Sequence, residues 1–191
     1  MKPVSLPDFI TFLSEQSATS FKSDVVDQFL ERHQLCEDAF LPFIFFREET
    51  YGRNLVYKTD LFELLILTWL PHQRTPIHDH GGQRCWVVLQ SGELTFKNFF
   101  TPESNEGPLR VMGPCEKYSA HDPVYIDDGI GIHSIANASS RPAVSMHLYA
   151  APIPRCQVYD EGAKRFKMVE LQYFTNPEIH FPAETEAPSA V

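Results

Sequence analysis

The sequence predicts a mainly β protein, in which a barrel or sandwich of short strands carries an N-terminal helical part on its outside. Two observations support this prediction. Apolar residues follow a helical period before about residue 43, and many short alternating segments separated by turns follow after it. A chain of 191 residues suits one compact domain. We therefore expect a single domain over 1–191, with a helical part at 1–42, a β-barrel at 43–176 and a flexible tail at 177–191.

The helical part begins near Pro7, a residue that suits the first turn of a helix. Within residues 5–35, apolar side chains then fall on two stripes at helical spacing. We expect both stripes to pack against the outside of the main body. They are formed by Phe9, Ile10, Phe12 and Leu13, and by Val25, Val26, Phe29 and Leu30.

Short segments of strand character follow in the rest of the chain. Ser91-Gly92 lies between two of them and indicates a hairpin. Many short strands at this spacing are typical of a β-sandwich or barrel. The expected strands are Asn54–Thr59, Phe62–Leu70, Cys85–Gln90, Glu93–Phe99, Arg110–Met112, Pro123–Ile126, His133–Ala136, Ala143–Ala150, Gln157–Tyr159 and Lys167–Phe174.

Composition and charge argue against several classes of function. The formal net charge is −9 and no basic stripe is visible, which disfavours nucleic acids and anionic membranes as partners. The longest apolar-rich stretch, Phe62–Leu70, is too short to cross a bilayer, and the beginning of the chain lacks the apolar run of a signal peptide. The four cysteines are widely scattered without a CxxC pair. We expect a cytoplasmic protein with reduced thiols.

Three histidines form the main candidate for a metal site. His78 and His80 are two residues apart in an extended segment, so their side chains point to the same face. An HxH pair alone is weak evidence, because histidine is common both as a ligand and at the surface. His133 follows a turn marked by Gly129 and Gly131, which could deliver its side chain into a barrel.

The spacing of these residues resembles the cupin superfamily of jelly-roll β-barrels. The first cupin motif has HxH, usually a glutamate, six further residues and a glycine. Here Cys85 stands at the glutamate position and Gly92 at the glycine position. The second motif is imperfect, since its glycine-to-histidine spacing is off by one, although His133 and Asn137 are spaced as expected. The resemblance implies a cupin-type jelly-roll for residues 43–176.

Replacing the usual glutamate by Cys85 has a chemical consequence. Three neutral imidazoles without the glutamate would leave a doubly charged metal centre with three open positions. Such a centre would attract a thiolate and lower the pKa of the thiol. Ligation by nitrogen alone suits Fe, Zn, Cu or Ni, so the pattern leaves the metal open.

Two further segments place polar side chains on shared faces. Ser145, His147 and Tyr149 alternate with apolar residues, as expected of a half-buried strand with a wetted face or of a strand that lines a polar lumen. In a lumen, Ser145 could orient His147, and His147 could orient the Tyr149 hydroxyl. Tyr51 and Arg53 are also two apart, and Arg53 could bind a carboxylate or be a solvated surface residue.

Taken together, the motifs resemble the thiol dioxygenases of the cysteine dioxygenase family. The resemblance implies an oxidoreductase with one Fe(II) per chain that adds both atoms of O₂ to the sulfur of free L-cysteine. The product would be cysteine sulfinic acid, a step of cysteine catabolism. The matching stretches cover about two-thirds of the chain, namely Tyr51–Val56, Ile77–Trp86 with Gly92-Glu93-Leu94, Tyr125–His133, and Ala143–Tyr149 followed by Cys156.

The resemblance also implies a role for each candidate residue. In that family three histidines hold Fe(II), an arginine binds the substrate carboxylate and a tyrosine acts on the bound reactants. In eukaryotic members a cysteine forms a thioether with that tyrosine. By position, these roles fall on His78, His80 and His133 for iron, Arg53 and Tyr51 for the carboxylate, Tyr149 with Ser145 and His147 for catalysis, and Cys85 for a thioether to Tyr149.

One departure and three rival functions accompany this interpretation. The family often has a Ser-Pro step, frequently a cis peptide, after the tyrosine, whereas this chain has Ala150-Ala151. The nearest rival is a dioxygenase of another small thiol such as 3-mercaptopropionate, but relatives with that preference tend to carry glutamine at the arginine position, so Arg53 favours cysteine. A non-catalytic ligand-binding cupin is the second rival. A zinc-dependent hydrolase or isomerase is the third, and it is disfavoured because no acidic residue stands at the usual base position. We expect a monomer whose partners are L-cysteine and O₂.

Overall fold

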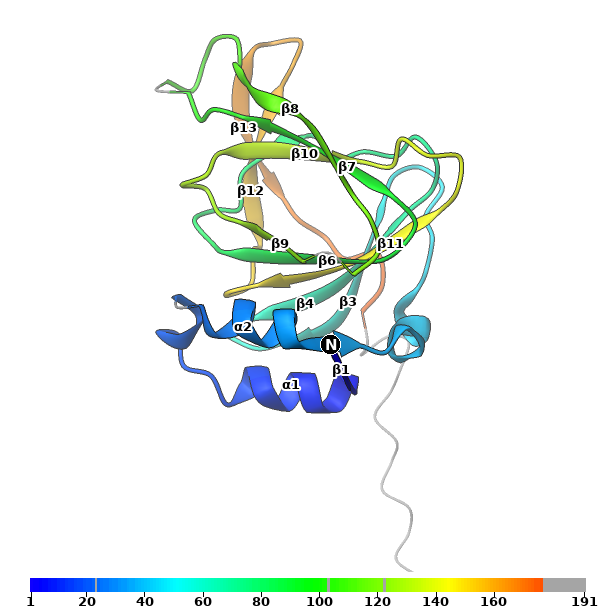
Figure 1. The fold of residues 1–191 in the computed structure, drawn as a ribbon. Coiled ribbons are helices and arrows are strands. Elements are labelled where there is room, and N and C mark those ends of the chain that lie inside the picture. The colour runs from blue at the N-terminus through cyan, green and yellow to red at the C-terminus, as the bar shows by residue number, and fades with distance from the viewer. Residues whose placement is uncertain (23, 103, 122, 177–191) are drawn as a thin grey trace, which may run out of the picture.

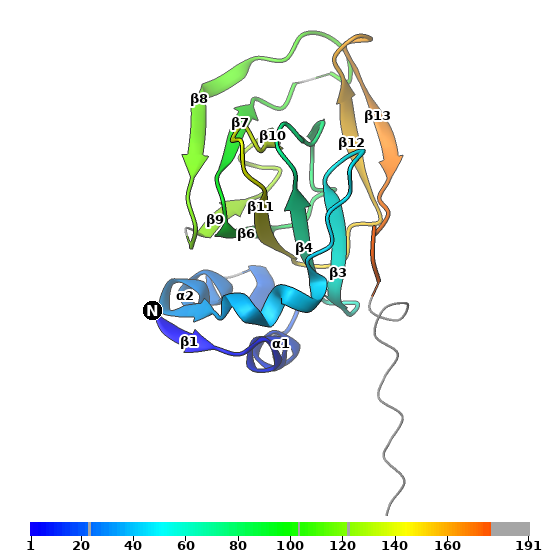
Figure 2. The ribbon, with the colours of Figure 1, turned by 90° about the vertical axis from the view of Figure 1, so that its right-hand side faces the viewer.

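The computed structural model describes residues 1–22, 24–102, 104–121 and 123–176. Two β-sheets form the body of the protein, and the N-terminal helices lie against one of them (Figures 1 and 2). In this described part of the chain, strand pairing runs within each sheet, so the body is a jelly-roll sandwich and not a closed barrel. The predicted mainly β jelly-roll class is confirmed. The expected tail at 177–191 lies outside the described residues.

Two short helices cover the outer face of one sheet. The first, α1 (Leu6–Ser14), begins after Ser5, whose hydroxyl accepts a hydrogen bond from the Asp8 amide at 3.2 Å. The second is α2 (Val25–Arg32). Where the structure describes the chain, neither helix nor any other is long and apolar enough to cross a bilayer. Both apolar stripes contribute fully buried or nearly buried side chains, which are Phe9, Leu13, Val26 and Leu30.

Four other N-terminal elements are not predicted from the sequence. Strands β1 (Lys2–Val4) and β2 (His33–Leu35) pair in parallel, and two 3₁₀ helices lie at Ser20–Lys22 and Glu37–Phe43. A strand of three residues is too short to show a period of two in its polarity, which explains why the sequence pattern does not reveal these elements.

The five-stranded sheet lies next to the helices (Figure 2). Its order is β3-β4-β11-β6-β9, and every neighbouring pair is antiparallel. Because it is covered on one side by the helices and on the other by the second sheet, most of its residues are buried on both faces. Its strands are β3 (Gly52–Lys58), β4 (Glu63–Trp69), β6 (Cys85–Ser91), β9 (Pro123–Ile126) and β11 (Ala143–Tyr149).

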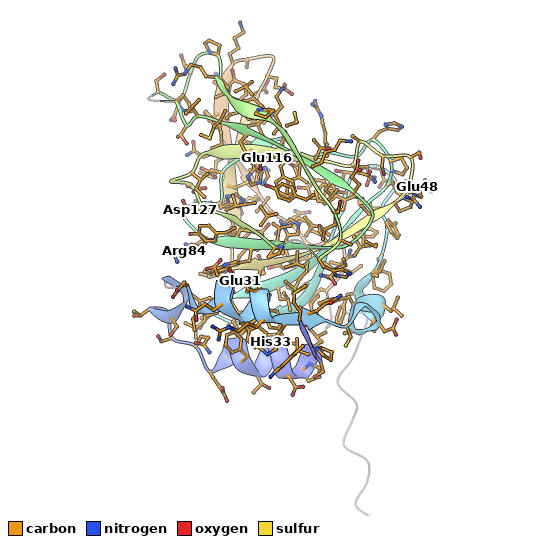
Figure 3. The ribbon with its side chains drawn as sticks, in the orientation of Figure 1. Glu31, His33, Glu48, Arg84, Glu116 and Asp127 are labelled. Atoms are coloured by element: carbon orange, nitrogen blue, oxygen red, sulfur yellow. The ribbon has the colours of Figure 1, made fainter. Side chains whose placement is uncertain are left out.

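The six-stranded sheet faces it across the core, and side chains from both sheets fill the space between them (Figure 3). Its order is β13-β12-β5-β10-β7-β8. Its central strand β5 has only two residues, yet it joins β12 to β10. The strands are β5 (Ile77–His78), β7 (Leu94–Phe99), β8 (Val111–Tyr118), β10 (Ile132–Ala136), β12 (Arg155–Asp160) and β13 (Arg165–Glu170).

Strand β4 contributes side chains to two hydrophobic clusters, one under the helices and one between the sheets. Its residues are all buried, but successive side chains point to opposite faces. Leu64 and Ile66 pack with the helices, whereas Leu65 and Leu67 pack between the two sheets. Glu63 has the same parity as Leu65, so its carboxylate also faces the interior between the sheets.

The expected strand Lys167–Phe174 is wrong in its bounds, because β13 ends at Glu170. The chain then leaves the six-stranded sheet and runs beside β3. There the Leu55 amide donates to the Thr175 carbonyl at 3.0 Å and the Phe174 amide donates to the Arg53 carbonyl at 2.7 Å. The apolar pattern of this stretch reflects packing on a second sheet, not one continuous strand.

Two glycines are required by the backbone around the core. Gly92 has φ +84° in the β6–β7 hairpin, and a Cβ atom there would lie 2.7 Å from the Ala143 Cβ. Gly131 has φ +145°, and its Cβ would lie 2.5 Å from the Phe99 carbonyl oxygen. Only glycine combines these dihedral angles with such close approach. Gly131 thereby lets β10 begin directly beside β7 and fixes the position of His133.

Candidate metal centre

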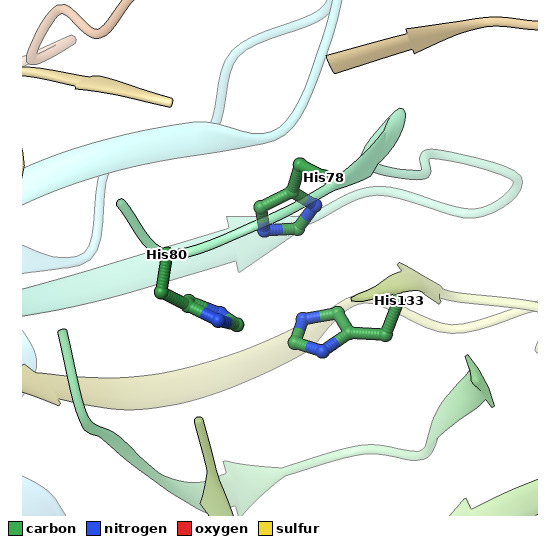
Figure 4. Close-up of side chains that lie close together, drawn as sticks. All are labelled: His78, His80 and His133. Atoms are coloured by element: carbon green, nitrogen blue, oxygen red, sulfur yellow. The ribbon is translucent and has the colours of Figure 1, made fainter. Parts of the chain in front are cut away.

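Three histidine side chains converge between the sheets (Figure 4). His78 lies on β5 directly opposite His133 on β10, and His80 follows two residues after His78. The ring centroids are 4.8 Å apart for His78 and His133, 4.8 Å for His80 and His133, and 5.4 Å for His78 and His80. One ring nitrogen from each lies within 4.8 Å of the others. Such a cluster can hold one metal ion.

The outward nitrogens of two rings lie next to protein oxygens. The Nδ1 of His78 lies 2.9 Å from the Pro76 carbonyl oxygen, which can only accept, so Nδ1 carries the hydrogen and Nε2 keeps its lone pair. The Nδ1 of His80 lies 3.3 Å from a carboxylate oxygen of Asp128, without the geometry of a hydrogen bond. These contacts leave the inward nitrogens available to a ligand.

His133 provides the test of whether a metal fits. Its Nε2 is buried and has no hydrogen-bond partner among the described residues. A buried imidazole nitrogen left without a partner carries a free-energy cost, which coordination to a metal would remove. Burial and the neighbouring histidines hold the pKa of His133 well below its usual range, and burial followed by His80 lowers the pKa of His78 to about 3. His78 and His133 thus suit a transition metal as neutral ligands, and His80 offers a third imidazole beside them.

Two aspartates shape the segment that carries His80. Asp128 accepts hydrogen bonds from the amides of His80 at 2.7 Å and Gly82 at 2.6 Å. Asp79 accepts a hydrogen bond from the Gln157 amide at 2.8 Å and so ties the segment to β12. Sequence reasoning missed this role of Asp128, although the Asp127-Asp128-Gly129 turn next to a candidate ligand was a visible signal. In the described part of the chain, no carboxylate joins the three-histidine cluster.

The opposite wall of the site comes from β11. Ser145, His147 and Tyr149 are buried and point between the sheets, so the strand lines a polar interior and not a wetted face. The Trp69 indole donates to the Ser145 Oγ at 2.9 Å, and the same Oγ lies 2.9 Å from His147 Nε2. The Ser145 hydroxyl, having accepted from Trp69, is free to donate to His147. The expected contact of Ser145 with His147 is therefore present.

The expected hydrogen bond from His147 to the Tyr149 hydroxyl is absent from the described structure, where the two ring centroids are 6.2 Å apart. The Nε2 of His147 is directed to Ser145, which lies on the opposite side of His147 from Tyr149 along the strand. His147 instead contacts Ser145, which in turn accepts a hydrogen bond from the Trp69 indole.

Cys85 and Tyr149 are direct cross-strand neighbours. They occupy paired positions of β6 and β11, where side chains share a face and Cβ atoms lie about 4.5–5.5 Å apart. Cys85 is completely buried and Tyr149 is 4% exposed. Burial raises the pKa of both groups, and the hydrogen-bonding contact of Tyr149 with Cys85 partly opposes this for the thiol. Tyr149 therefore remains a protonated hydrogen-bond donor beside the histidine cluster.

Arg53 and Tyr51 complete the wall from β3 and the residue before it. Arg53 is 9% exposed, and its guanidinium carbon lies 6.0 Å from the Tyr149 ring centroid. Its Nε and Nη2 have no hydrogen-bond partner among the described residues. The Tyr51 ring stacks on Trp69 with centroids 5.0 Å apart, and burial raises its pKa. A buried cation with two open donors is suited to a small anion.

One small cavity brings these groups together. All nine candidate site residues except Ser145 line it, and Ser145 contacts it through His147. The remaining lining residues are Leu67, Thr75, Val87, Ile126 and Ile135.

The segment after Tyr149 departs from the family pattern in sequence and adopts its own backbone. In the described residues, no peptide bond is cis. Ala151 has φ +93°, a value that side-chain-bearing residues rarely adopt. The Ala150 amide donates to the Arg84 carbonyl at 2.9 Å, which ties the end of β11 to the segment before β6.

Asn137, the residue spaced four after His133, has a structural role. Its side-chain amide donates to the carbonyls of Trp69 at 3.2 Å and Arg141 at 2.8 Å, and its oxygen accepts from the Ser139 amide at 3.0 Å. These bonds hold the turn between β10 and β11. Asn137 therefore connects the two sheets outside the cavity.

Fold and site together define a class: a cupin-type jelly-roll with a three-histidine metal site and a buried arginine in the same cavity. Comparison with protein families then gives a match to the cysteine dioxygenase type I family over residues 2–162. The chain belongs to this family, whose members are oxidoreductases of the non-haem iron dioxygenase class.

Individual relatives agree with this assignment. Cysteine dioxygenase type 1 of Danio rerio is 29% identical over 188 residues, covering 96% of this chain and 93% of the relative. The Homo sapiens protein of the same name is 28% identical over 188 residues, covering 97% and 94%. Among solved structures, a Klebsiella pneumoniae protein with a double-stranded β-helix domain covers 71% of this chain and 96% of its own, at 16% identity and a TM-score of 0.47. The match of the family model over residues 2–162 confirms the predicted family membership.

Proposed function

We propose that the protein catalyses the Fe(II)-dependent addition of both atoms of O₂ to the thiol of L-cysteine, with cysteine sulfinic acid as the product. One observation carries the proposal: three clustered histidines and a buried arginine with open donors face the same small cavity. The relatives named above act on cysteine according to their names.

His78, His80 and His133 are the residues that would hold the iron. When bound, Fe(II) supplies coordination positions at which a thiolate and O₂ can meet, and proximity of this kind can lower a barrier by about 7–11 kcal/mol. The protein supplies no carboxylate to the cluster in its described part, so these positions stay open to exogenous ligands.

Arg53 would bind the substrate carboxylate. Its open Nε and Nη2 donors match the two oxygens of a carboxylate in a paired arrangement. Tyr51, stacked on Trp69, forms the adjacent wall and limits the room around the bound substrate. Fixing the carboxylate orients the thiol of the same molecule toward the histidine cluster.

Tyr149 would donate a hydrogen bond to the reacting sulfur or oxygen. Burial keeps its hydroxyl protonated, so it can stabilise negative charge that develops during the reaction. Ser145 and His147 keep the neighbouring wall rigid through the Trp69 indole.

The overall reaction needs no external reductant. The sulfur loses four electrons, O₂ gains four, and both oxygen atoms end on the sulfur of cysteine sulfinic acid. The proton of the thiol is balanced by the acid proton of the product. The thiol itself is therefore the only electron donor that the reaction requires.

We also propose a thioether between Cys85 Sγ and the ring of Tyr149, in at least part of the population. Their paired positions on β6 and β11 bring the two groups together. Formation of this bond removes the thiol hydrogen and one ring hydrogen, with two electrons passing to O₂ as the oxidant.

All four cysteines of the chain are free of disulfides, which agrees with the reducing cytoplasm as its location.

The test is O₂ uptake by the Fe(II)-loaded protein in the presence of L-cysteine. We expect one O₂ consumed per cysteine, and mass spectrometry should identify the sulfinic acid. Protein freed of metal with a chelator is the control and should consume no O₂. Faster oxidation of 3-mercaptopropionate than of cysteine would overturn the substrate assignment, and metal-bound protein without any thiol-dependent O₂ uptake would favour a ligand-binding role.

A further inference from the structure

A buried carboxylate lies directly behind the proposed carboxylate-binding arginine. Glu63 is the first residue of β4 and is completely inaccessible to solvent. It is paired with Tyr149 on β11 and with Lys58 on β3, and Tyr149 is in turn paired with Cys85. Glu63 therefore belongs to one cross-strand row that runs through the five-stranded sheet to the reactive end of the cavity.

The carboxylate of Glu63 has two differently occupied oxygens. The Tyr173 hydroxyl donates a hydrogen bond to Oε1, and Lys58 Nζ donates to that hydroxyl oxygen at 3.0 Å. Oε2 lies 3.8 Å from Arg53 Nη2 and has no hydrogen-bond partner among the described residues. The hydrogen bond from Tyr173 thus holds Glu63 from the surface side. Its interaction with the Arg53 guanidinium is electrostatic, without a hydrogen bond.

Tyr173 reaches this position because the chain after β13 runs along β3. The Phe174 amide donates to the Arg53 carbonyl at 2.7 Å, which fixes the residue next to Tyr173 against the strand that carries Arg53. Burial and the hydrogen bond to Glu63 raise the pKa of Tyr173, so the hydroxyl remains a donor. The C-terminal segment therefore closes the wall behind Arg53.

Arg53 needs such a partner. A guanidinium that is 9% exposed is costly unless a negative charge compensates it. The Tyr149 ring, 6.0 Å away, gives a weak cation–π contact, whereas Glu63 offers a full charge at 3.8 Å. Because Glu63 forms no hydrogen bond with Arg53, the Nε and Nη2 donors are not consumed by it.

We propose that Glu63 is the positioning residue of the carboxylate-binding site: its charge holds the Arg53 guanidinium beside Tyr149 while its anchoring to Tyr173 leaves the guanidinium donors open for substrate. This inference rests on the proposed function. It adds to that function a residue through which the C-terminal segment controls how tightly substrate binds.

The pairing itself can be tested in metal-free protein without any activity measurement. Urea unfolding is compared for the wild type, Glu63→Gln, Arg53→Met and the double variant. Each single change leaves a buried charge unpaired, whereas the double change removes both charges. We expect the double variant to be at least as stable as either single variant. Additive losses of stability would overturn the pairing.

The positioning role is tested by steady-state kinetics with cysteine and the Fe(II)-loaded protein. Glu63→Gln should raise KM by about tenfold and leave kcat within about twofold, because a displaced arginine weakens substrate binding more than the chemical step. Glu63→Asp keeps the charge and should recover part of the loss. The matched control is Glu161→Gln, which removes the same charge from an exposed pair with Arg74 and should leave both constants unchanged.

Two outcomes separate this inference from the proposed function. Wild-type protein that does not oxidise cysteine contradicts the proposed function, and the unfolding comparison still decides the pairing. Active wild type with an unchanged KM in Glu63→Gln overturns the positioning role. Should Glu63→Gln not fold, Tyr173→Phe removes the hydrogen bond to Glu63 together with the one that Lys58 donates to the Tyr173 hydroxyl. This variant should raise KM by a few-fold, and an unchanged value would contradict the proposal equally.

Discussion

The two sheets face one cavity with opposite chemistry. The six-stranded sheet and the residues next to β5 supply His78, His80 and His133, whose ring nitrogens can ligate a metal. The five-stranded sheet supplies Arg53 and Tyr149, which are hydrogen-bond donors. The candidate metal ligands and the groups proposed to bind the organic substrate therefore come from different sheets.

Burial explains both halves of this difference. Removing water disfavours the charged form of any titratable group. It therefore lowers the pKa of His133 and leaves its nitrogen free to ligate, while it raises the pKa of Tyr149 and leaves its hydroxyl able to donate. One dry interior thus prepares acceptors on one sheet and donors on the other. Arg53 keeps its charge there with Glu63 as its counterion.

The largest expected effect concerns the six-stranded sheet. His133→Ala removes one of the three candidate ligands and should abolish stoichiometric iron binding. Activity should then fall by at least about a hundredfold, since even residues that only support metal ligands change metal affinity by 10–100-fold. Metal analysis after Fe(II) loading and desalting measures it. His72→Asn, an exposed histidine with positive φ, is the control and should load iron normally. Full iron content in His133→Ala would remove His133 from the site.

The next effect concerns the five-stranded sheet. Arg53→Ala should keep iron content and raise the KM for cysteine by about a hundredfold, because loss of one partner of a buried charge pair typically costs several kcal/mol. Unchanged iron with a raised KM would show that the two sheets act separately. An unchanged KM would remove Arg53 from the substrate site, and loss of iron would break the comparison between the sheets.

A pH prediction applies to both sheets. In the unfolded chain, histidines take up protons near pH 6.5, whereas burial holds the pKa values of His133 and His147 well below this in the fold. The unfolded state therefore binds more protons below pH 6.5. The free energy of unfolding of metal-free protein should fall as pH drops, by up to about 1.4 kcal/mol per pH unit for each such histidine.

Urea unfolding of metal-free protein at pH 7.5, 6.5 and 5.5 measures this slope. His147→Gln keeps an acceptor for Ser145 and should reduce the slope of the free energy of unfolding against pH by the contribution of one histidine. The control His72→Asn, at an exposed position, should leave the slope unchanged. A slope that does not change in His147→Gln would mean that His147 is charged in the folded protein.

The smallest effect is expected at the Cys85–Tyr149 pair. The thioether should lower the intact mass by two hydrogens and give a second band on denaturing gels after turnover. Cys85→Ala and Tyr149→Phe should both lack the mass change, and Cys85→Ala should lose only a few-fold in kcat because Tyr149 still donates its hydrogen bond. Wild-type protein without the mass change would contradict the crosslink.

Much of the site could be predicted from local spacing. His78 and His80 share a face because they are two apart in an extended segment. The proximity of Cys85 and Tyr149 follows from the family resemblance and not from spacing, since 64 residues separate them in the chain. The roles given to these residues remain predictions. Boundaries were harder: β8 extends to Tyr118 although only Arg110–Met112 is expected, since its exposed alternation carries little apolar signal.

The partners of Glu63 and Asp128 could not be predicted, because they lie far away in the chain, although the turn that contains Asp128 was a visible signal. Asp128 binds amides 46 and 48 residues before it, and Glu63 receives its hydrogen bond from Tyr173, 110 residues later. An acidic residue at the start of an apolar strand has the sequence signature of an ordinary strand end. Only the tertiary structure shows that Glu63 is completely buried, and a buried charge is what indicates a functional partner.

By itself, the sequence determined the mainly β class, the two helices on its outside and the residue types that could meet at one metal site, because these follow from periodicity and short-range spacing. The jelly-roll arrangement was implied by the family resemblance. The tertiary structure alone decided which sheet each functional group comes from, that Arg53 is buried against Glu63, and that the segment after β13 closes the wall behind it. Those features depend on the packing of distant segments and on the exclusion of water, and neither is written in local sequence pattern.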